Sequence, residues 1–227
     1  DMETNGYFTP AYLLRELAKE MGEQETRPQR SQNNQELLEQ LYKVGLMTEA
    51  NKEQIVADSV LLGSSEYGAY LPYLTNIQRI DFPMKGTMAE GYPMILSALS
   101  ALDTTLSAIT FKLEQVDRPA DQPATGEYFQ VTFSGLGQES STIIHAHEDS
   151  GDTPGQPPRL LFIPTYLKVI DDLLEKANYP QRLFTAELWG QVDSEDAPIP
   201  VYLLLADKTQ QPVIDQHYFQ LQLSGND

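Results

Sequence analysis

The sequence contains no cysteine among its 227 residues. This absence excludes a disulfide framework, metal sites built from thiolates and any Cys nucleophile. Long apolar runs are also missing, because stretches such as residues 201–206 are far too short to span a bilayer. The chain begins at Asp1 and shows no signal peptide, so we expect a processed or truncated chain. Membrane contact is then expected only through a segment absent from this chain.

Basic residues are scarce: 15 Lys and Arg stand against 33 Asp and Glu, which gives a formal net charge of -18. A field of this sign repels phosphate backbones and anionic headgroups, so nucleic acid is not an expected partner. Protein partners are expected instead, including a second copy of the chain in a homodimer. The alternative is that the acidic surface serves only to keep the protein dissolved.

The first 75 residues show the apolar spacing of helices. Caps and terminal glycines predict three helices, which cover residues 9–22, 37–45 and 48–63. Thr48 is the expected N-cap of the third helix, and Gly63 is its expected end. The polar stretch 23–34 contains Pro28 and no large apolar side chain, so it predicts an exposed linker. We therefore predict a helical N-terminal region over residues 1–75.

Beyond this region the pattern changes to alternation, which is interrupted by two amphipathic helices. The expected strands cover residues 79–84, 109–113, 129–133, 142–147, 160–163, 183–192, 199–206 and 218–223, and the expected helices cover residues 95–102 and 166–174. The Gly- and Pro-rich segment 149–158 predicts a boundary between two helix-on-antiparallel-sheet units, over residues 76–150 and 151–227. The predicted fold class is therefore α+β. The repeated order indicates either a duplicated unit or a coincidence that is common in this class.

Residues 80–135 combine a strand that leads into Pro83, a Gly91-Tyr92 helix entry, a leucine-rich helix and two amphipathic strands. This pattern resembles the periplasmic ferredoxin-like βαββ domain of the PilO family of type IV pilus assembly proteins. The resemblance implies a ferredoxin-like arrangement and a non-enzymatic scaffold that pairs with itself or with a relative. It also implies a periplasmic location, and it carries over no catalytic residue.

The segment with the clearest candidate metal ligands is the run that contains His145, His147 and Asp149. In a strand, residues 145 and 147 point to one face, where two imidazoles and a carboxylate can bind Zn, Ni or Cu. Glu148 follows His147 directly, which is not the spacing of a cupin site. The simpler interpretation is a strand that runs into a solvated turn.

Other polar positions are interpreted as structural. Asp171 and Asp172 are adjacent on an expected helix, so their side chains diverge by about 100° and should form its wet face instead of an acid/base pair. Gly135 and Gly137 are followed by a strand, which excludes a dinucleotide-binding loop. Ser134 lacks the first glycine of a nucleophile elbow.

Three further features have plain interpretations. Asp193–Asp196 lacks the ligand alternation of a calcium loop and predicts a hairpin turn. His217, beside Tyr218, is expected to be a hydrogen-bonded residue of the last strand. Trp189 is expected to pack against the fold, and its alternative role is an interface anchor.

The function predicted from these observations is that of a non-enzymatic, extracytoplasmic assembly or protein-binding component, of the kind found in pilus or secretion-type envelope complexes. No cofactor is expected. The alternative is a metal-binding protein or metalloenzyme that uses His145 and His147. For a homodimer, a sheet edge such as the last expected strand, 218–223, is an expected point of contact.

Overall fold

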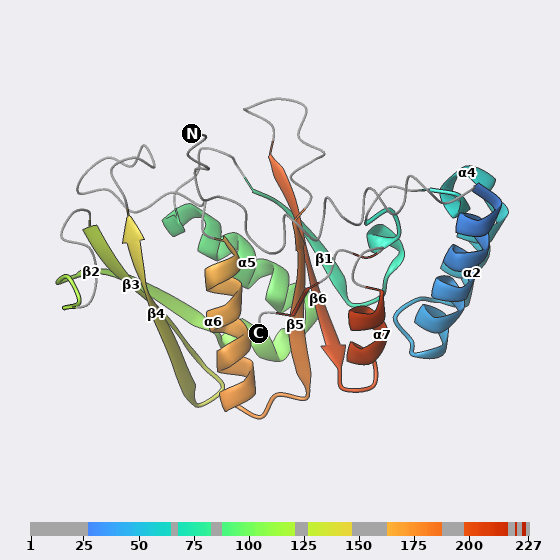
Figure 1. Ribbon diagram of the computed structural model, residues 1–227. Coiled ribbons are helices and arrows are strands. Elements are labelled where there is room, and N and C mark those ends of the chain that lie inside the picture. The colour runs from blue at the N-terminus through green and yellow to red at the C-terminus, as the bar shows by residue number, and fades with distance from the viewer. Residues whose placement is uncertain are drawn as a thin grey trace, which may run out of the picture. The chain divides into compact units, whose positions relative to one another are not determined.

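The structure is a computed structural model that describes residues 27–64, 68–82, 88–120, 127–146, 163–187, 198–217, 221 and 224–225 (Figure 1). The chain divides into two compact units, and their first boundary falls between Thr75 and Asn76. The first unit comprises Asp1–Thr75 and Val213–Gln222, and the second comprises Asn76–Pro212 and Leu223–Asp227. The helix predicted at residues 9–22 lies outside the described residues.

The described part of the first unit is mainly helical. It contains α2 (Arg27–Lys43), α3 (Glu49–Ala57), α4 (Ser59–Leu62) and the 3₁₀ helix η1 (Leu71–Tyr73). The prediction of an exposed linker over residues 23–34 is wrong from Arg27 onward, because α2 already begins there. Pro28 lies in the first turn of this helix, where an N–H group has no helical partner to lose, so proline does not prevent helix formation.

The predicted ends of the third helix are confirmed, with an interruption between them. Thr48 caps α3 through its side chain, which accepts a hydrogen bond from the Asn51 amide. Asp58 interrupts the expected single helix: it has extended backbone angles and caps α4 by accepting hydrogen bonds from two amides. Gly63 follows α4 as its C-cap. Short polar side chains that compete for backbone groups explain both the start and the break.

Asn34 is the polar residue that connects α2 with the end of α4. Only 5% of its surface is exposed, and its side-chain amide donates hydrogen bonds to the carbonyls of Leu62 at 2.8 Å and Ser64 at 3.3 Å. The Tyr70 hydroxyl donates to the same Leu62 carbonyl at 3.2 Å, and burial raises the pKa of Tyr70 to about 12. These bonds supply partners for carbonyls that a helix end leaves open.

We predict that Asn34→Ala lowers the free energy of unfolding by about 1–3 kcal/mol, because it leaves buried carbonyls with fewer donors. Urea unfolding followed by circular dichroism measures this loss. Gln35→Ala is the matched control, because Gln35 is an exposed neighbour on the same helix. Equal losses in the two variants would contradict the role of Asn34.

The second unit confirms the α+β class and the antiparallel pairing. Its elements are β1 (Ile77–Phe82), α5 (Met88–Leu102), the 3₁₀ helix η2 (Thr104–Ala108), β2 (Thr110–Val116), β3 (Glu127–Gly135), β4 (Gln138–Ala146), α6 (Ile163–Lys176), β5 (Gln181–Glu187), β6 (Ile199–Asp207) and β7 (Ser224–Gly225). One sheet has the order β1-β6-β5-β7, and the other has the order β2-β3-β4. All of their strand pairs are antiparallel.

The pairing partners differ from those of two self-contained units over residues 76–150 and 151–227. β1 pairs with β6, and Ile80 lies opposite Val201, so strands from both sides of residue 150 share one sheet. The ferredoxin-like arrangement is not confirmed either, because β2 and β3 pair with β4 and not with β1. Apolar alternation marks which face of a strand is buried, but it does not specify which strand lies beside it.

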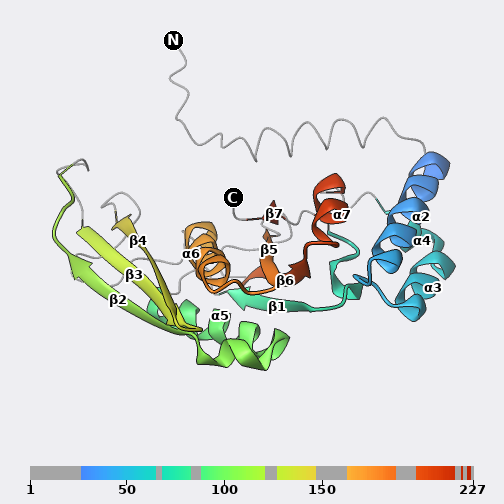
Figure 2. The ribbon, with the colours of Figure 1, turned by 90° about the horizontal axis from the view of Figure 1, so that it is seen from below.

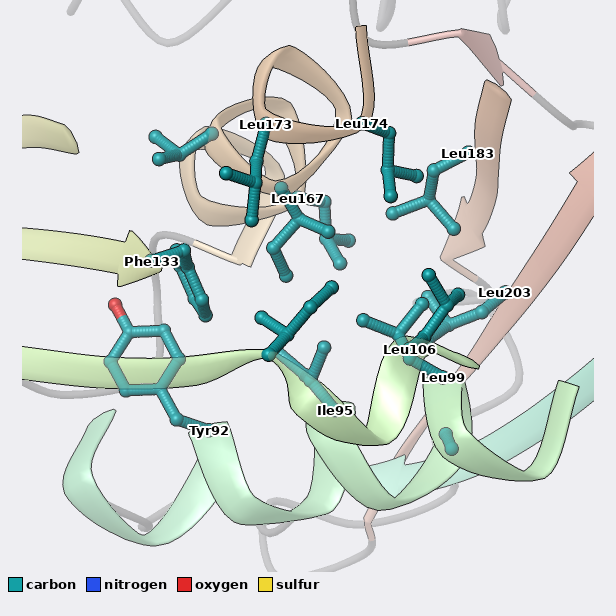
Figure 3. Close-up of a cluster of buried hydrophobic side chains, with 14 of the residues drawn as sticks. Tyr92, Ile95, Leu99, Leu106, Phe133, Leu167, Leu173, Leu174, Leu183 and Leu203 are labelled. Atoms are coloured by element: carbon teal, nitrogen blue, oxygen red, sulfur yellow. The ribbon is translucent and has the colours of Figure 1, made fainter. Parts of the chain in front are cut away.

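A single apolar core fills the space between the two sheets. In both Figure 1 and Figure 2 the helices α5 and α6 lie between the three-stranded sheet and the strands β1, β6 and β5. The two helices contribute large buried side chains such as Tyr92, Leu99 and Leu173, and the sheets contribute Phe133 and Leu203 (Figure 3). Each sheet therefore buries one face against the same pair of helices.

Polar contacts connect α6 with distant parts of the unit. The Tyr179 hydroxyl, just beyond α6, donates a hydrogen bond of 2.5 Å to the Asp103 carboxylate at the end of α5, and this bond lowers the pKa of Asp103. Lys176 donates to the Ser140 hydroxyl at 3.1 Å and to the Glu139 carbonyl at 3.1 Å. The end of α6 is thus fixed to both its neighbouring helix and β4.

The ends of two predicted strands are corrected. Ile163 was expected to close a strand over residues 160–163, but it begins α6. The strand expected over residues 218–223 is wrong at Leu221, which is helical and donates its amide to the His217 carbonyl at 3.0 Å. The short helix α7 (Gln211–Gln216) precedes it. None of the helices in the described ranges is both long and apolar enough for a membrane span.

Candidate functional site

The three-stranded sheet carries His145, one of the candidate metal ligands predicted from the sequence. His145 lies on β4 opposite Tyr128 of β3, and the two rings stack with their centroids 4.6 Å apart and their planes at 7°. His147 and Asp149 lie outside the described residues. Within the described ranges no three His, Cys, Asp or Glu side chains gather in a way that could hold a metal ion. The structure therefore assigns the His145 ring an aromatic contact, and the three-residue metal site remains a prediction.

Asp171 is a buried charged residue, and the prediction that it is exposed is wrong. It was expected on the wet face of its helix, but only 1% of its surface is exposed. Its carboxylate accepts hydrogen bonds from the Arg182 guanidinium at 2.6 to 3.1 Å and from the Leu183 amide at 2.8 Å. These hydrogen bonds with Asp171 raise the pKa of Arg182. The pair fastens α6 to the start of β5, so its role is structural.

The remaining polar candidates also have structural partners or lie outside the description. The Ser134 hydroxyl lies 3.1 Å from the Glu139 carboxylate, to which it donates. Leu136 and Gly137 both have positive φ angles, 54° and 75°, and form the two-residue turn between β3 and β4, which confirms that this segment is not a nucleotide loop. Residues 189 and 193–196 are not among the described residues.

His217 has the hydrogen bond that was expected, although not in a strand. Its Nε2 atom lies 2.9 Å from the Gln40 side-chain oxygen of α2, and burial lowers the pKa of His217. A neutral imidazole that donates to Gln40 is consistent with both observations. This residue therefore stabilises the helical unit.

The outer face of the three-stranded sheet is partly exposed to solvent. Its cross-strand rows are Val116–Tyr128–His145, Glu114–Gln130–Ile143, Lys112–Thr132–Ser141 and Thr110–Ser134–Glu139. The first row contains the buried Tyr128, whereas Ile143 in the second row is 48% exposed. The opposite face carries the buried Phe129, Val131 and Phe133. The sheet thus has one face in the core and a largely polar outer face, with an exposed isoleucine on its edge strand β4.

The two edges of this sheet are not equivalent. Lys176 of α6 donates to the Glu139 carbonyl of β4, so an amine already occupies part of that edge. Among the described strands, β2 pairs only with β3. Figure 2 shows β2 as the outer arrow, on the side of β3 opposite β4. The sequence could not reveal this edge, because edge position depends on strand order.

The chain was compared with protein-family models, with curated proteins and with solved structures, and none of the three comparisons gave a match. They therefore do not bear on the resemblance of residues 80–135 to the PilO family.

We predict that Asp171→Ala lowers the free energy of unfolding by about 3–5 kcal/mol, because it removes the buried partner of Arg182 and of the Leu183 amide. Asp172→Ala, the adjacent and partly exposed control, should change it by less than about 1 kcal/mol. Chemical unfolding of both variants provides the comparison. A loss below about 1 kcal/mol for Asp171→Ala would show that the ion pair is dispensable.

We also predict that replacing His145 and His147 together by Ala changes stability by less than about 1 kcal/mol and removes no bound metal. Thermal unfolding and elemental analysis of the purified full chain test the two parts. One equivalent of zinc or nickel in the original protein, lost in the double variant, would establish the metal-binding alternative instead.

Proposed function

We propose that this protein is a non-enzymatic binding or assembly component that works by docking other proteins onto its three-stranded sheet. The observation that carries the proposal is the outer face of β2, β3 and β4, which is partly exposed and carries the exposed Ile143 of β4 beside polar side chains. Protein interfaces combine apolar contacts with polar ones in this way.

The polar groups of the described chain support the same proposal. Asp171, Ser134 and His217 each have a partner that positions a helix, a strand pair or a segment end. Catalysis by general acids and bases requires groups that remain available to a substrate. Where the structure describes the candidate catalytic or ligand side chains, they form hydrogen bonds or ring contacts that hold the fold together.

The charge of the chain narrows the proposed partners. With a net charge of -18, the protein attracts basic surfaces and repels acidic ones unless local contacts compensate. The proposal therefore includes partners with a basic docking surface and partners whose contact patch is locally balanced. An extracytoplasmic location and a place in a pilus-type envelope complex belong to the proposal through the resemblance of residues 80–135.

We predict that Ile143→Lys weakens docking at least about fivefold, because the exposed apolar contact of the face is replaced by a charge. A photoreactive residue at the exposed position Ser141 of the full chain reports docking through the yield of cross-linked protein in extracts of the source cells. Mass spectrometry then identifies the cross-linked chains.

Val60→Lys is the matched control, because Val60 is an exposed apolar residue of the helical unit and is 72% exposed. The Ser141 cross-links should persist in this variant. Cross-links that are equally strong in the Ile143 and Val60 variants, or none above the level of a denatured chain, would contradict docking at this face.

A further inference from the structure

Within the described residues, β2 has no strand on the side away from β3. Its seven residues, TFKLEQV, include no proline and no glycine, and they form a regular ladder with β3 along their whole length. Natural edge strands are commonly shortened, bulged or covered, because unpaired N–H and C=O groups invite another strand. In the described chain neither a bulge nor a second strand protects β2.

We propose that β2 pairs antiparallel with the β2 strand of a second copy of this chain, about a two-fold axis that passes beside Leu113. This inference rests on the proposed function of the sheet in docking and adds a second contact, at the edge opposite the strand that carries Ile143. Leu113 is the middle residue of β2, so this register overlaps the two strands over their whole length. An axis at one residue is compatible with either phase of the antiparallel hydrogen-bond pattern.

Charge selects this register. Lys112 and Glu114 flank Leu113 on the outer face, and an axis beside Leu113 places Lys112 of each copy opposite Glu114 of the other. An axis at residue 112 would instead oppose two lysines, and an axis at residue 114 would oppose two glutamates. Unlike charges directly across a strand pair stabilise it, and like charges destabilise it.

Lys112 and Glu114 are available for this exchange. Their side chains are 67% and 52% exposed, and they form an ion pair of 2.7 Å with each other on the strand surface. In the paired strands the two cations and two anions would alternate in one cluster. No charge would have to be buried, so the pairing avoids the desolvation cost of an internal salt bridge.

The inner face of the pair is also compatible. Leu113 is half-buried against the core, and the axis places it opposite the same residue of the second copy. Phe111 remains in place on the Tyr92 ring, with centroids 4.6 Å apart, and lies opposite Gln115 of the second copy. The result is one continuous six-stranded sheet whose apolar face stays covered by the helices of each copy.

The net charge of -18 opposes this association at long range. Raising ionic strength from about 0.01 M to 0.15 M shortens the Debye length from about 30 Å to about 8 Å, which screens the repulsion between whole chains more than the contacts at the edge. The dimer should therefore strengthen with salt. One strand edge buries less surface than a standard interface of about 1,600 Å², so we expect a weak dimer. It should become detectable at a protein concentration on the order of 100 μM.

The experiment is a charge exchange on the full chain, followed by sedimentation equilibrium over a concentration and salt series. Lys112→Glu and Glu114→Lys should each weaken dimerisation at least about tenfold, because each variant opposes like charges in two places. The double variant K112E/E114K should restore it to within about threefold. A mixture of the two single variants should form a heterodimer, because all its cross-strand pairs are again unlike.

Lys168→Glu on α6 and Glu53→Lys on α3 are the controls, because both residues are exposed and each control changes the net charge by the same amount as one test variant. The controls should leave dimerisation within about twofold of the original chain. A dimer that survives Lys112→Glu, or a double variant as weak as the single variants, overturns the proposed register.

A chain that stays monomeric at every salt concentration and above about 100 μM overturns the second copy as partner. If the Ser141 cross-links still depend on Ile143 in that case, the proposed docking function stands with a different protein. If those cross-links are also absent, both proposals fail.

Discussion

The antiparallel pairing of β1 with β6 is the constraint on which the α+β unit depends. It joins two strands that are more than a hundred residues apart, with Ile80 opposite Val201. Since α5 follows β1 directly and α6 precedes β5, this pairing brings both helices to the same core. Tyr92 of α5 and Leu173 of α6 are therefore buried in one apolar cluster. Two separate units would need two cores, each covered by a single helix.

Local signals were readable from the sequence, whereas long-range ones were not. The Thr48 cap and the alternation of Phe129, Val131 and Phe133 depend on a few neighbouring residues, and both are confirmed. The partner of β1 was not predictable, because many strands could satisfy the same alternation. The burial of Asp171 and Asn34 is not readable from the sequence, since it depends on tertiary hydrogen bonds with Arg182 and Leu62 respectively.

The same distinction applies to the candidate site. The sequence pointed to His145 because histidine is a conspicuous ligand, and the structure places its ring against Tyr128. The outer face of the sheet and the edge position of β2 are not readable from the sequence, since both depend on the order of the described strands. The sequence did supply the constraint of charge, because two copies of a chain of net charge -18 repel each other unless their contact is locally balanced.

The repulsion between acidic chains is the reason that the Lys112–Glu114 pair matters for the proposed dimer. On a strongly acidic surface, non-specific pairing of an edge strand with another copy is opposed, because the two chains repel each other before their backbone groups can form hydrogen bonds. A lysine and a glutamate placed symmetrically about Leu113 relieve this repulsion in one register and add to it in the neighbouring ones. In the proposed dimer, the long-range field would suppress other strand additions, while the local charges would permit one defined pairing.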